Sequence, residues 1–147
     1  MTTIATVDKD RILLNWAAQN PLLTDALLFL YLGDYAGSCA IVPIQGDVVK
    51  KWYVDGSSVR VYDFAMQLTQ PVSSTTDDVN IANMYIQRQW ADWITEQQEA
   101  GNYPDFGPKC SGYSLELLSN MPTLAQLYEN GLGKYQFYAR LKYEEER

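Results

Sequence analysis

The sequence predicts an α+β domain in which one long helix packs on one face of a mostly antiparallel sheet, together with a long β-hairpin and a short N-terminal helix. Two β-rich runs surround an Asp55-Gly56 turn signal in residues 48–70, residues 78–100 have apolar side chains at helical spacing, and apolar and polar residues alternate over residues 135–143. A chain of 147 residues with 47% hydrophobic side chains can form a hydrophobic core. We therefore expect a single domain over residues 1–147.

The first predicted helix spans Asp8–Ala18. Thr6 or Asp8 can cap its start, and Asn20-Pro21 ends it, because the residue before proline disfavours the helical conformation. Its apolar residues recur on one side at helical spacing, namely Ile12, Leu13, Trp16 and Ala17.

Two short strands are predicted next. The apolar run over residues 26–32 is compatible with a buried strand or a helical turn, and we favour the strand. A second short strand over Cys39–Ile44 is expected to stop at Pro43. The residues Gln45-Gly46-Asp47 then turn the chain into the hairpin.

The hairpin in residues 48–70 organises the rest of the chain. Its expected register pairs Val54 with Val59, Trp52 with Val61 and Lys50 with Asp63. Because side chains alternate between the faces of a strand, this register creates an apolar cluster on an otherwise polar face near the tip. The cluster contains Trp52, Val54, Val59 and Val61. Exposed, it would mark an interaction surface, whereas cover by another part of the same chain would make it core.

The long helix is predicted over Asp78–Ala100, between a polar loop that can cap it and a Gly101-Asn102 stop. One apolar stripe should lie across the sheet, formed by Val79, Ala82, Ile86, Trp90, Trp93, Ile94 and Gln97. A second apolar set, Ile81, Met84 and Tyr85, falls on the far side of the first half and has no predicted partner within the domain. We interpret this set as a second candidate contact surface.

The C-terminal part is predicted to contain a crossing loop over residues 102–111 and a strand over Tyr113–Leu118. Residues 121–133 suggest a helical turn or a loop closed by Asn130-Gly131. The final strand has an apolar residue at every second position, namely Tyr135, Phe137, Ala139, Leu141 and Tyr143.

Composition limits the classes of partner. The formal net charge is −7, and clustered lysines and arginines that would hold nucleic acid nonspecifically are missing. The N-terminus does not resemble a signal peptide and the longest apolar run is too short for a bilayer, so we expect a protein made in the cytoplasm with no membrane partner. Cys39 and Cys110 are isolated and the chain has no histidine for a zinc site, so we favour two buried free thiols, with a disulfide between them as the alternative.

No catalytic, cofactor-binding or metal site is predicted. The absence of histidine removes the commonest general base and every Ser-His or Cys-His nucleophile pair. Three carboxylate pairs remain, Asp8 with Asp10, Asp77 with Asp78 and Asp34 with Asp47. Each falls in a turn or at a helix start, where capping and solvation account for it. We therefore expect a structural protein, with a small acidic hydrolase or a small-molecule binding domain as alternatives from other classes.

Five stretches carry a resemblance to a known family. They are NPLL (20–23), FLYLGD (29–34), GDVVKKWYVDGSSVRVYDFAMQ (46–67), IQRQWADWITEQQEAGNYPDF (86–106) and YQFYARLKYEEE (135–146). In this order they cover 65 of the 147 residues and resemble minor capsid or tail-completion proteins from the head-tail region of phages with long, noncontractile tails. These proteins are in turn similar to tail terminators.

The resemblance implies a ring subunit, with sixfold symmetry expected, at the head-proximal end of the tail tube in a virion assembled in the host bacterial cytoplasm. There the ring would stop tube polymerisation and present a surface to the neck proteins. The implied partners are other copies of the chain, the tail tube protein and head-tail connector proteins, while DNA only passes through the lumen. Another head-tail component, such as a head-closure or minor capsid protein, is the alternative.

The contact between copies is expected to use the hairpin tip and the second helix set. Its predicted residues are Trp52, Val54, Asp55, Gly56, Val59, Val61, Ile81, Met84 and Tyr85. Trp52 is the expected anchor, because tryptophan is enriched in binding hot spots. The family brings no catalytic residues and no cofactor.

Overall fold

The computed structural model of the protein describes residues 8–21, 27–29, 37–72, 77–118, 123–128 and 131–146. Its elements are α1 (Lys9–Ala17), β1 (Leu27–Phe29), β2 (Cys39–Trp52), β3 (Ser58–Pro71), α2 (Asp77–Ala100), β4 (Cys110–Leu117), β5 (Thr123–Leu127) and β6 (Leu132–Glu145). One sheet has the order β1-β2-β3-β6-β4, and β5 pairs with the start of β6. Every described strand pair except β1 with β2 is antiparallel, so the predicted α+β class is confirmed.

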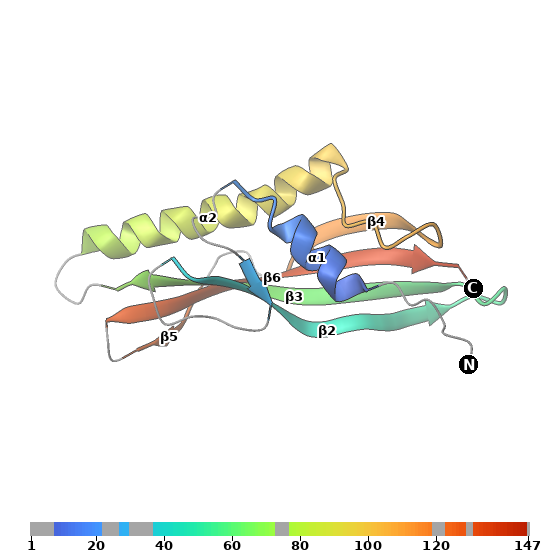
Figure 1. Ribbon diagram of the computed structural model, residues 1–147, viewed down its shortest axis with the longest axis horizontal. Helices are drawn as coiled ribbons and strands as arrows, with labels where there is room; N and C mark the ends of the chain where they lie inside the picture. Colours follow the sequence, from blue (N-terminus) through green and yellow to red (C-terminus); the bar gives the residue numbers. More distant parts are fainter. Residues whose placement is uncertain are drawn as a thin grey trace.

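Both helices pack on the same face of the elongated sheet (Figure 1). Trp16 of α1 contacts Phe64 of β3 and Trp93 of α2, with ring centroids 6.4 and 5.0 Å apart. Trp90 of α2 meets Phe137 of β6 at 5.5 Å. The sheet residues of this core alternate along β3 and β6, namely Tyr62, Phe64, Met66, Leu68, Phe137, Ala139, Leu141 and Tyr143. The other face of β3 and β6 is therefore turned away from both helices.

The predicted first helix is confirmed. The Asp8 carboxylate caps α1 by accepting a hydrogen bond from the Arg11 backbone N–H at 3.1 Å. Leu13, Trp16 and Ala17 are buried, and the Trp16 indole N–H donates to the Asn102 carbonyl at 2.9 Å. This bond joins α1 to the end of α2. Of the predicted apolar run after α1, residues 27–29 form the strand β1, and the remainder lies outside the described residues.

The predicted stop at Pro43 is wrong, because β2 continues through it to Trp52. Register shifts between Pro43 and Gln45, and between Gln45 and Val48, accommodate the residues that were expected to turn. β1 pairs only with the first residues of β2, up to Ile41. Beyond that point the described part of β2 has a sheet partner on one side alone, and proline is tolerated in such an edge strand.

The hairpin forms, but all three predicted pairings are wrong. The observed register pairs Trp52 with Ser58, Lys51 with Val59 and Val48 with Val61. The Gly56 N–H donates to the Tyr53 carbonyl at 3.0 Å, and the Tyr53 N–H donates to the Ser57 carbonyl at 2.9 Å. Gly56 has φ +90°, so a type I turn followed by a left-handed glycine closes a three-residue loop centred on Asp55. The predicted register assumed a loop centred beyond Gly56.

The predicted long helix is confirmed as α2. Gly101 ends it at φ +70°, and the Asn102 N–H donates back to the Gln97 carbonyl at 3.0 Å, as in a Schellman motif. The predicted stripe holds in the second half, where Trp90, Trp93 and Ile94 are buried. In the first half it is wrong, since Ile86 and Ala82 are exposed and Gln87 is the buried residue. Of Val79 only the backbone is described.

The last strands correct one prediction and confirm another. Residues 123–127 form β5, which pairs with β6, where a helical turn or a loop was expected. The Gly131 N–H donates to the Tyr128 carbonyl at 3.2 Å in the connection between them. The strict alternation of β6 is confirmed, with Tyr135, Phe137, Ala139, Leu141 and Tyr143 all buried. Cys39 and Cys110 are buried free thiols, as predicted.

Candidate assembly surfaces

The hairpin tip projects apolar side chains into solvent. Trp52 is 63% exposed, Val54 is fully exposed, and Tyr53 is partly exposed beside them. The Asp55 carboxylate stiffens the turn by accepting hydrogen bonds from the Ser57 hydroxyl at 2.6 Å and the Ser57 N–H at 2.9 Å. These bonds, the hydroxyl bond first, lower the pKa of Asp55. The tip is therefore an ordered apolar projection.

Trp52 lies on the face opposite to the predicted one. It pairs with Ser58, so it shares the helix side of the sheet with Arg60, whose guanidinium lies 5.8 Å from the centroid of the indole ring. Arg60 is also held by the Glu145 carboxylate at 2.8 Å. The shift of register explains the change of face, because a displacement by an odd number of residues moves a side chain to the other side of a strand. The exposure of Trp52 agrees with the prediction, and its role in assembly stays a prediction.

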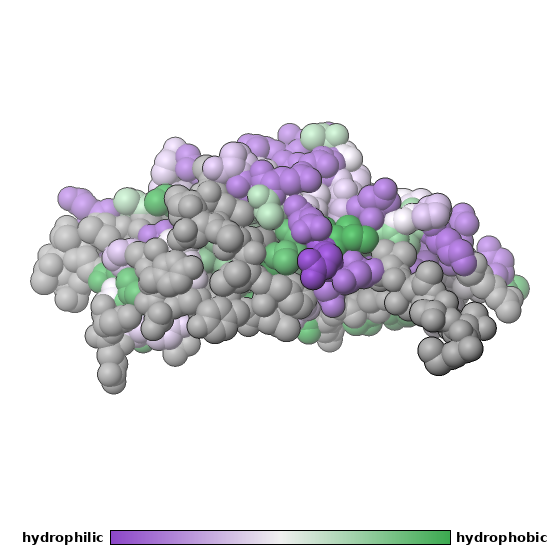
Figure 2. All heavy atoms as spheres, in the orientation of Figure 1, coloured by the Kyte–Doolittle hydropathy of each residue, from purple (hydrophilic) through white to green (hydrophobic). Residues whose placement is uncertain are grey.

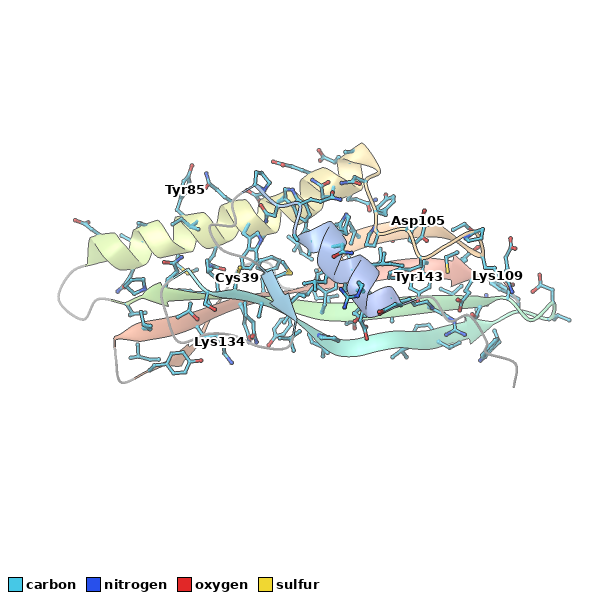
Figure 3. All side chains as sticks on the ribbon, in the orientation of Figure 1. Cys39, Tyr85, Asp105, Lys109, Lys134 and Tyr143 are labelled. Atoms are coloured by element: carbon cyan, nitrogen blue, oxygen red, sulfur yellow. The ribbon has the colours of Figure 1, made fainter. Side chains whose placement is uncertain are left out.

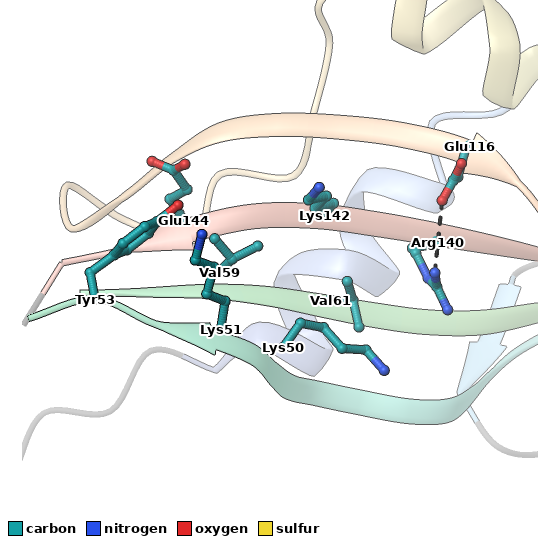
Figure 4. Close-up of a pocket in the computed structure, with 9 residues that line it drawn as sticks. All are labelled: Lys50, Lys51, Tyr53, Val59, Val61, Glu116, Arg140, Lys142 and Glu144. Atoms are coloured by element: carbon teal, nitrogen blue, oxygen red, sulfur yellow. Dashed lines mark ion pairs between the residues drawn. The ribbon is translucent and has the colours of Figure 1, made fainter. Parts of the chain in front are cut away.

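Val59 and Val61 do not form an exposed cluster with Trp52. They lie on the open face of the sheet and are only 8% and 2% exposed, because long charged side chains cover them. Both valines line a depression of about 450 Å³, whose lining residues are drawn in Figure 4. Its lining residues are Lys50, Lys51, Tyr53, Val59, Val61, Glu116, Arg140, Lys142 and Glu144. The prediction that the two valines are an exposed contact surface is therefore wrong for this chain on its own.

An ion pair borders this depression. The Arg140 guanidinium donates to both oxygens of the Asp63 carboxylate, at 2.7 and 2.9 Å, and lies 3.9 Å from Glu116. Asp63 is buried, and its carboxylate raises the pKa of Arg140 through these hydrogen bonds. Within the described part of the chain, Lys50 and Lys142 have no carboxylate partner. Among the described residues, the depression therefore has cationic groups that no carboxylate neutralises.

The second predicted patch lies on the outer side of α2. Ile81 and Tyr85 are 65% and 63% exposed, and Figure 3 shows Tyr85 pointing away from the sheet. Met84 is half-buried, so only two members of this set are freely exposed. Helical spacing continues the line of Ile81 and Tyr85 into acidic side chains, namely Asp92, Glu96 and Glu99, which are all exposed. The outer side of α2 is thus apolar near its start and acidic near its end.

The structure does not bring the two predicted patches together. The β2–β3 turn lies at one end of the long axis and the start of α2 at the other (Figure 1). The depression with its cationic residues was not predicted from the sequence. The sequence does contain a sign of it, because Arg140 and Lys142 lie at the polar positions of the last strand. The predicted hairpin register was wrong, however, and placed Lys50 opposite Asp63.

Two of the carboxylates considered for catalysis have structural roles, and Asp78 is exposed at the start of α2. Asp8 caps α1, and Asp10 accepts a hydrogen bond from the Tyr62 hydroxyl. The side chains of Asp34, Asp47 and Asp77 lie outside the described residues. No group of three or more potential metal-ligating side chains occurs among the described residues. Among the helices that the structure describes, none is long and apolar enough to cross a membrane.

Comparison with known proteins adds no assignment. No model of a protein family matches the chain, and no curated protein sequence matches it.

Proposed function

We propose that the protein is a structural subunit of a phage virion, a tail terminator or tail-completion protein that forms a ring at the head-proximal end of the tail tube. The observation that carries the proposal is that large apolar side chains remain exposed although the core between the helices and the sheet is closed. Trp52 and Val54 at the hairpin tip and Ile81 and Tyr85 on α2 are the main examples. Such patches on a small domain are typical of contact surfaces.

The ordered series of stretches that resemble the phage family supports a role in the head-tail region of a virion. Two of them contain exposed features of this chain, the hairpin tip and the outer side of the second half of α2. A ring of six copies would bring 6 × (−7) = −42 formal charges to the tube end. Repulsion between such a ring and DNA phosphates would let DNA pass through the lumen without being held.

Tail assembly followed by electron microscopy tests this function. Tube protein would be polymerised with and without the purified chain, and the lengths and ends of the tubes would be compared. We expect short tubes with a ring at one end when the chain is present, and long tubes without rings when it is absent. Gold-labelled chain found along the tube wall or on the capsid, with tube length unchanged, would contradict the proposal.

Two matched substitutions test whether the hairpin tip is needed for the capping of tubes. Trp52→Ser removes an exposed anchor at the hairpin tip, and Leu127→Ser changes a residue of β5 with nearly the same exposure, 62% against 63%. We expect Trp52→Ser to lose the capped ends and Leu127→Ser to keep them. Equal loss of capped ends in both variants would show that the hairpin tip has no specific role in assembly.

A further inference from the structure

The negative charge of the chain is concentrated on α2. This helix has five acidic residues and one arginine, a net charge of 1 − 5 = −4 out of −7 for the whole chain. Figure 2 shows hydrophilic side chains gathered over its exposed ridge. We call the line of Asp92, Glu96 and Glu99 the acidic ridge; all three side chains are exposed. The ridge therefore presents carboxylates at the surface, and none of the three forms an ion pair with another described residue.

The depression on the open face of the sheet has the opposite charge. Its lining contains four cationic residues and two carboxylates, a net charge of 4 − 2 = +2, around the floor of Val59 and Val61. We call it the cationic trough. The Arg140 guanidinium is paired with the Asp63 carboxylate, and the Lys51 ammonium lies 5.1 Å from the centroid of the Tyr53 ring. Lys50 and Lys142, which have no carboxylate partner among the described residues, are the cations left for an external partner.

The ridge and the trough lie on opposite sides of the sheet. Val59 and Val61 alternate with Tyr62 and Phe64, which pack under the helices. In Figure 4, which looks onto the trough, α1 lies behind the strands. A single chain therefore cannot bring its own ridge to its own trough, whereas two copies can.

The spacing of charges matches between the two surfaces. Asp92 and Glu99 are seven positions apart on a helix, which corresponds to roughly 10 Å along its axis. Lys51 on β2 pairs with Val59 of β3, and Lys142 on β6 pairs with Val61, so the two lysines are separated by two interstrand steps, roughly 10 Å, and by two residues along the strands, roughly 7 Å. A helix crossing the strands would place one end of the ridge near Lys50 and Lys51 and the other near Lys142.

We propose that the acidic ridge of one copy docks across the cationic trough of the next copy. This inference rests on the proposed function, and it adds the geometry of the contact between subunits. A contact between two different surfaces of the same chain is heterologous, and such contacts close into a ring when the rotation per copy divides a full turn. The occupant of the trough is thus a second copy, and its carboxylates neutralise Lys50 and Lys142.

Paired charge reversals test the contact by sedimentation velocity at low ionic strength. The ridge variant is Glu96→Lys with Glu99→Lys, and the trough variant is Lys50→Glu with Lys142→Glu. We expect each variant alone to associate at least ~10-fold more weakly than the wild type, since exposed ion pairs are replaced by like-charge contacts. An equimolar mixture of the two variants should recover the wild-type mass, because every ridge then meets a trough of opposite charge.

The recovery in the mixture shows that both variants fold and that the two surfaces face each other. Lys109→Glu, an exposed change of the same sign outside the trough, is the control and should leave association unchanged. Wild-type assembly should also weaken as salt rises, because exposed ion pairs are screened.

Three outcomes would overturn the inference. They are unchanged association in both variants, loss of association that the mixture does not recover, and a wild-type chain that stays monomeric at low salt. Retention of short duplex DNA that only the trough variant loses, with mass unchanged, would identify the trough as a polyanion site and would also overturn it. Capping of tubes by the wild-type chain in electron microscopy would keep the proposed function standing in each of these cases.

Discussion

Asp63 shows how a carboxylate can be buried on the open face of a sheet. It is 6% exposed and receives two hydrogen bonds from the Arg140 guanidinium, at 2.7 and 2.9 Å. A buried carboxylate loses hydration, and only a well-oriented cation offsets that loss. The pair therefore holds β3 against β6 beside the cationic trough.

Removing the cation should destabilise the fold. We expect Arg140→Ala to lower the free energy of unfolding by about 2 kcal/mol, because it leaves the buried Asp63 carboxylate without its hydrogen-bond donor. Urea unfolding followed by tryptophan fluorescence measures the change. Glu116→Ala is the control, since Glu116 is 59% exposed and 3.9 Å from Arg140, and its removal should cost less than about 0.5 kcal/mol. Equal losses of unfolding free energy in the two variants would show that the buried Arg140–Asp63 pair stabilises the fold no more than the exposed Arg140–Glu116 pair.

Asp55 makes a pH-dependent contribution to the hairpin turn. The Ser57 hydroxyl and N–H bonds lower its pKa in the folded chain from 3.8, so they stabilise the turn above the unfolded value and the stabilisation is lost as the pH falls through the folded value. Ser57→Ala removes the larger of these causes. We expect an NMR titration of the Asp55 carboxyl group to give a higher pKa in Ser57→Ala than in the wild type, and an unchanged value would contradict the geometry of the turn.

At the scale of elements, two tryptophans separate core packing from assembly. Trp90 of α2 is 2% exposed and packs edge-on against Phe137, whereas Trp52 at the hairpin tip is 63% exposed. We expect Trp90→Ala to lower the free energy of unfolding by about 3–5 kcal/mol, and Trp52→Ala by less than about 1 kcal/mol while it weakens assembly. Thermal denaturation measures both variants, and comparable losses would place Trp52 in the core.

Elements with a long, uninterrupted period were predictable. α2 and the alternating residues of β6 follow from the sequence because a helix of this length and a half-buried strand each impose a repeat on the apolar positions. The hairpin register was not predictable. It depends on whether the turn takes a left-handed glycine after a type I turn, and the Asp-Gly signal is compatible with loops of several lengths.

The burial of Val59 and Val61 shows why part of the site escaped prediction. These valines are covered by charged side chains from β2, β4 and β6, and the alternation within the hairpin contains no information about those neighbours. The exposure of Ile81 and Tyr85 was predictable, because a helix lying on a sheet has one outer side whatever the rest of the chain does. The exposed patch on α2 could therefore be predicted from local periodicity. The cationic trough could not, because it depends on which strands lie side by side in the folded chain.

At the scale of the whole molecule, the chain combines a closed core with three distinct outer surfaces. The apolar hairpin tip lies at one end, the partly acidic outer side of α2 covers one face, and the cationic trough occupies the other. Surfaces of opposite charge on opposite faces favour association in one orientation over random aggregation. The central claim is that this protein works as an assembly of copies.

Sedimentation velocity of the wild-type chain over a wide concentration range tests that claim most directly. With a chain mass of 16.7 kDa and the proposed sixfold symmetry, we expect one discrete assembly of about 100 kDa, from 6 × 16.7, whose fraction grows with concentration. A single species of 16.7 kDa at every concentration would contradict the account.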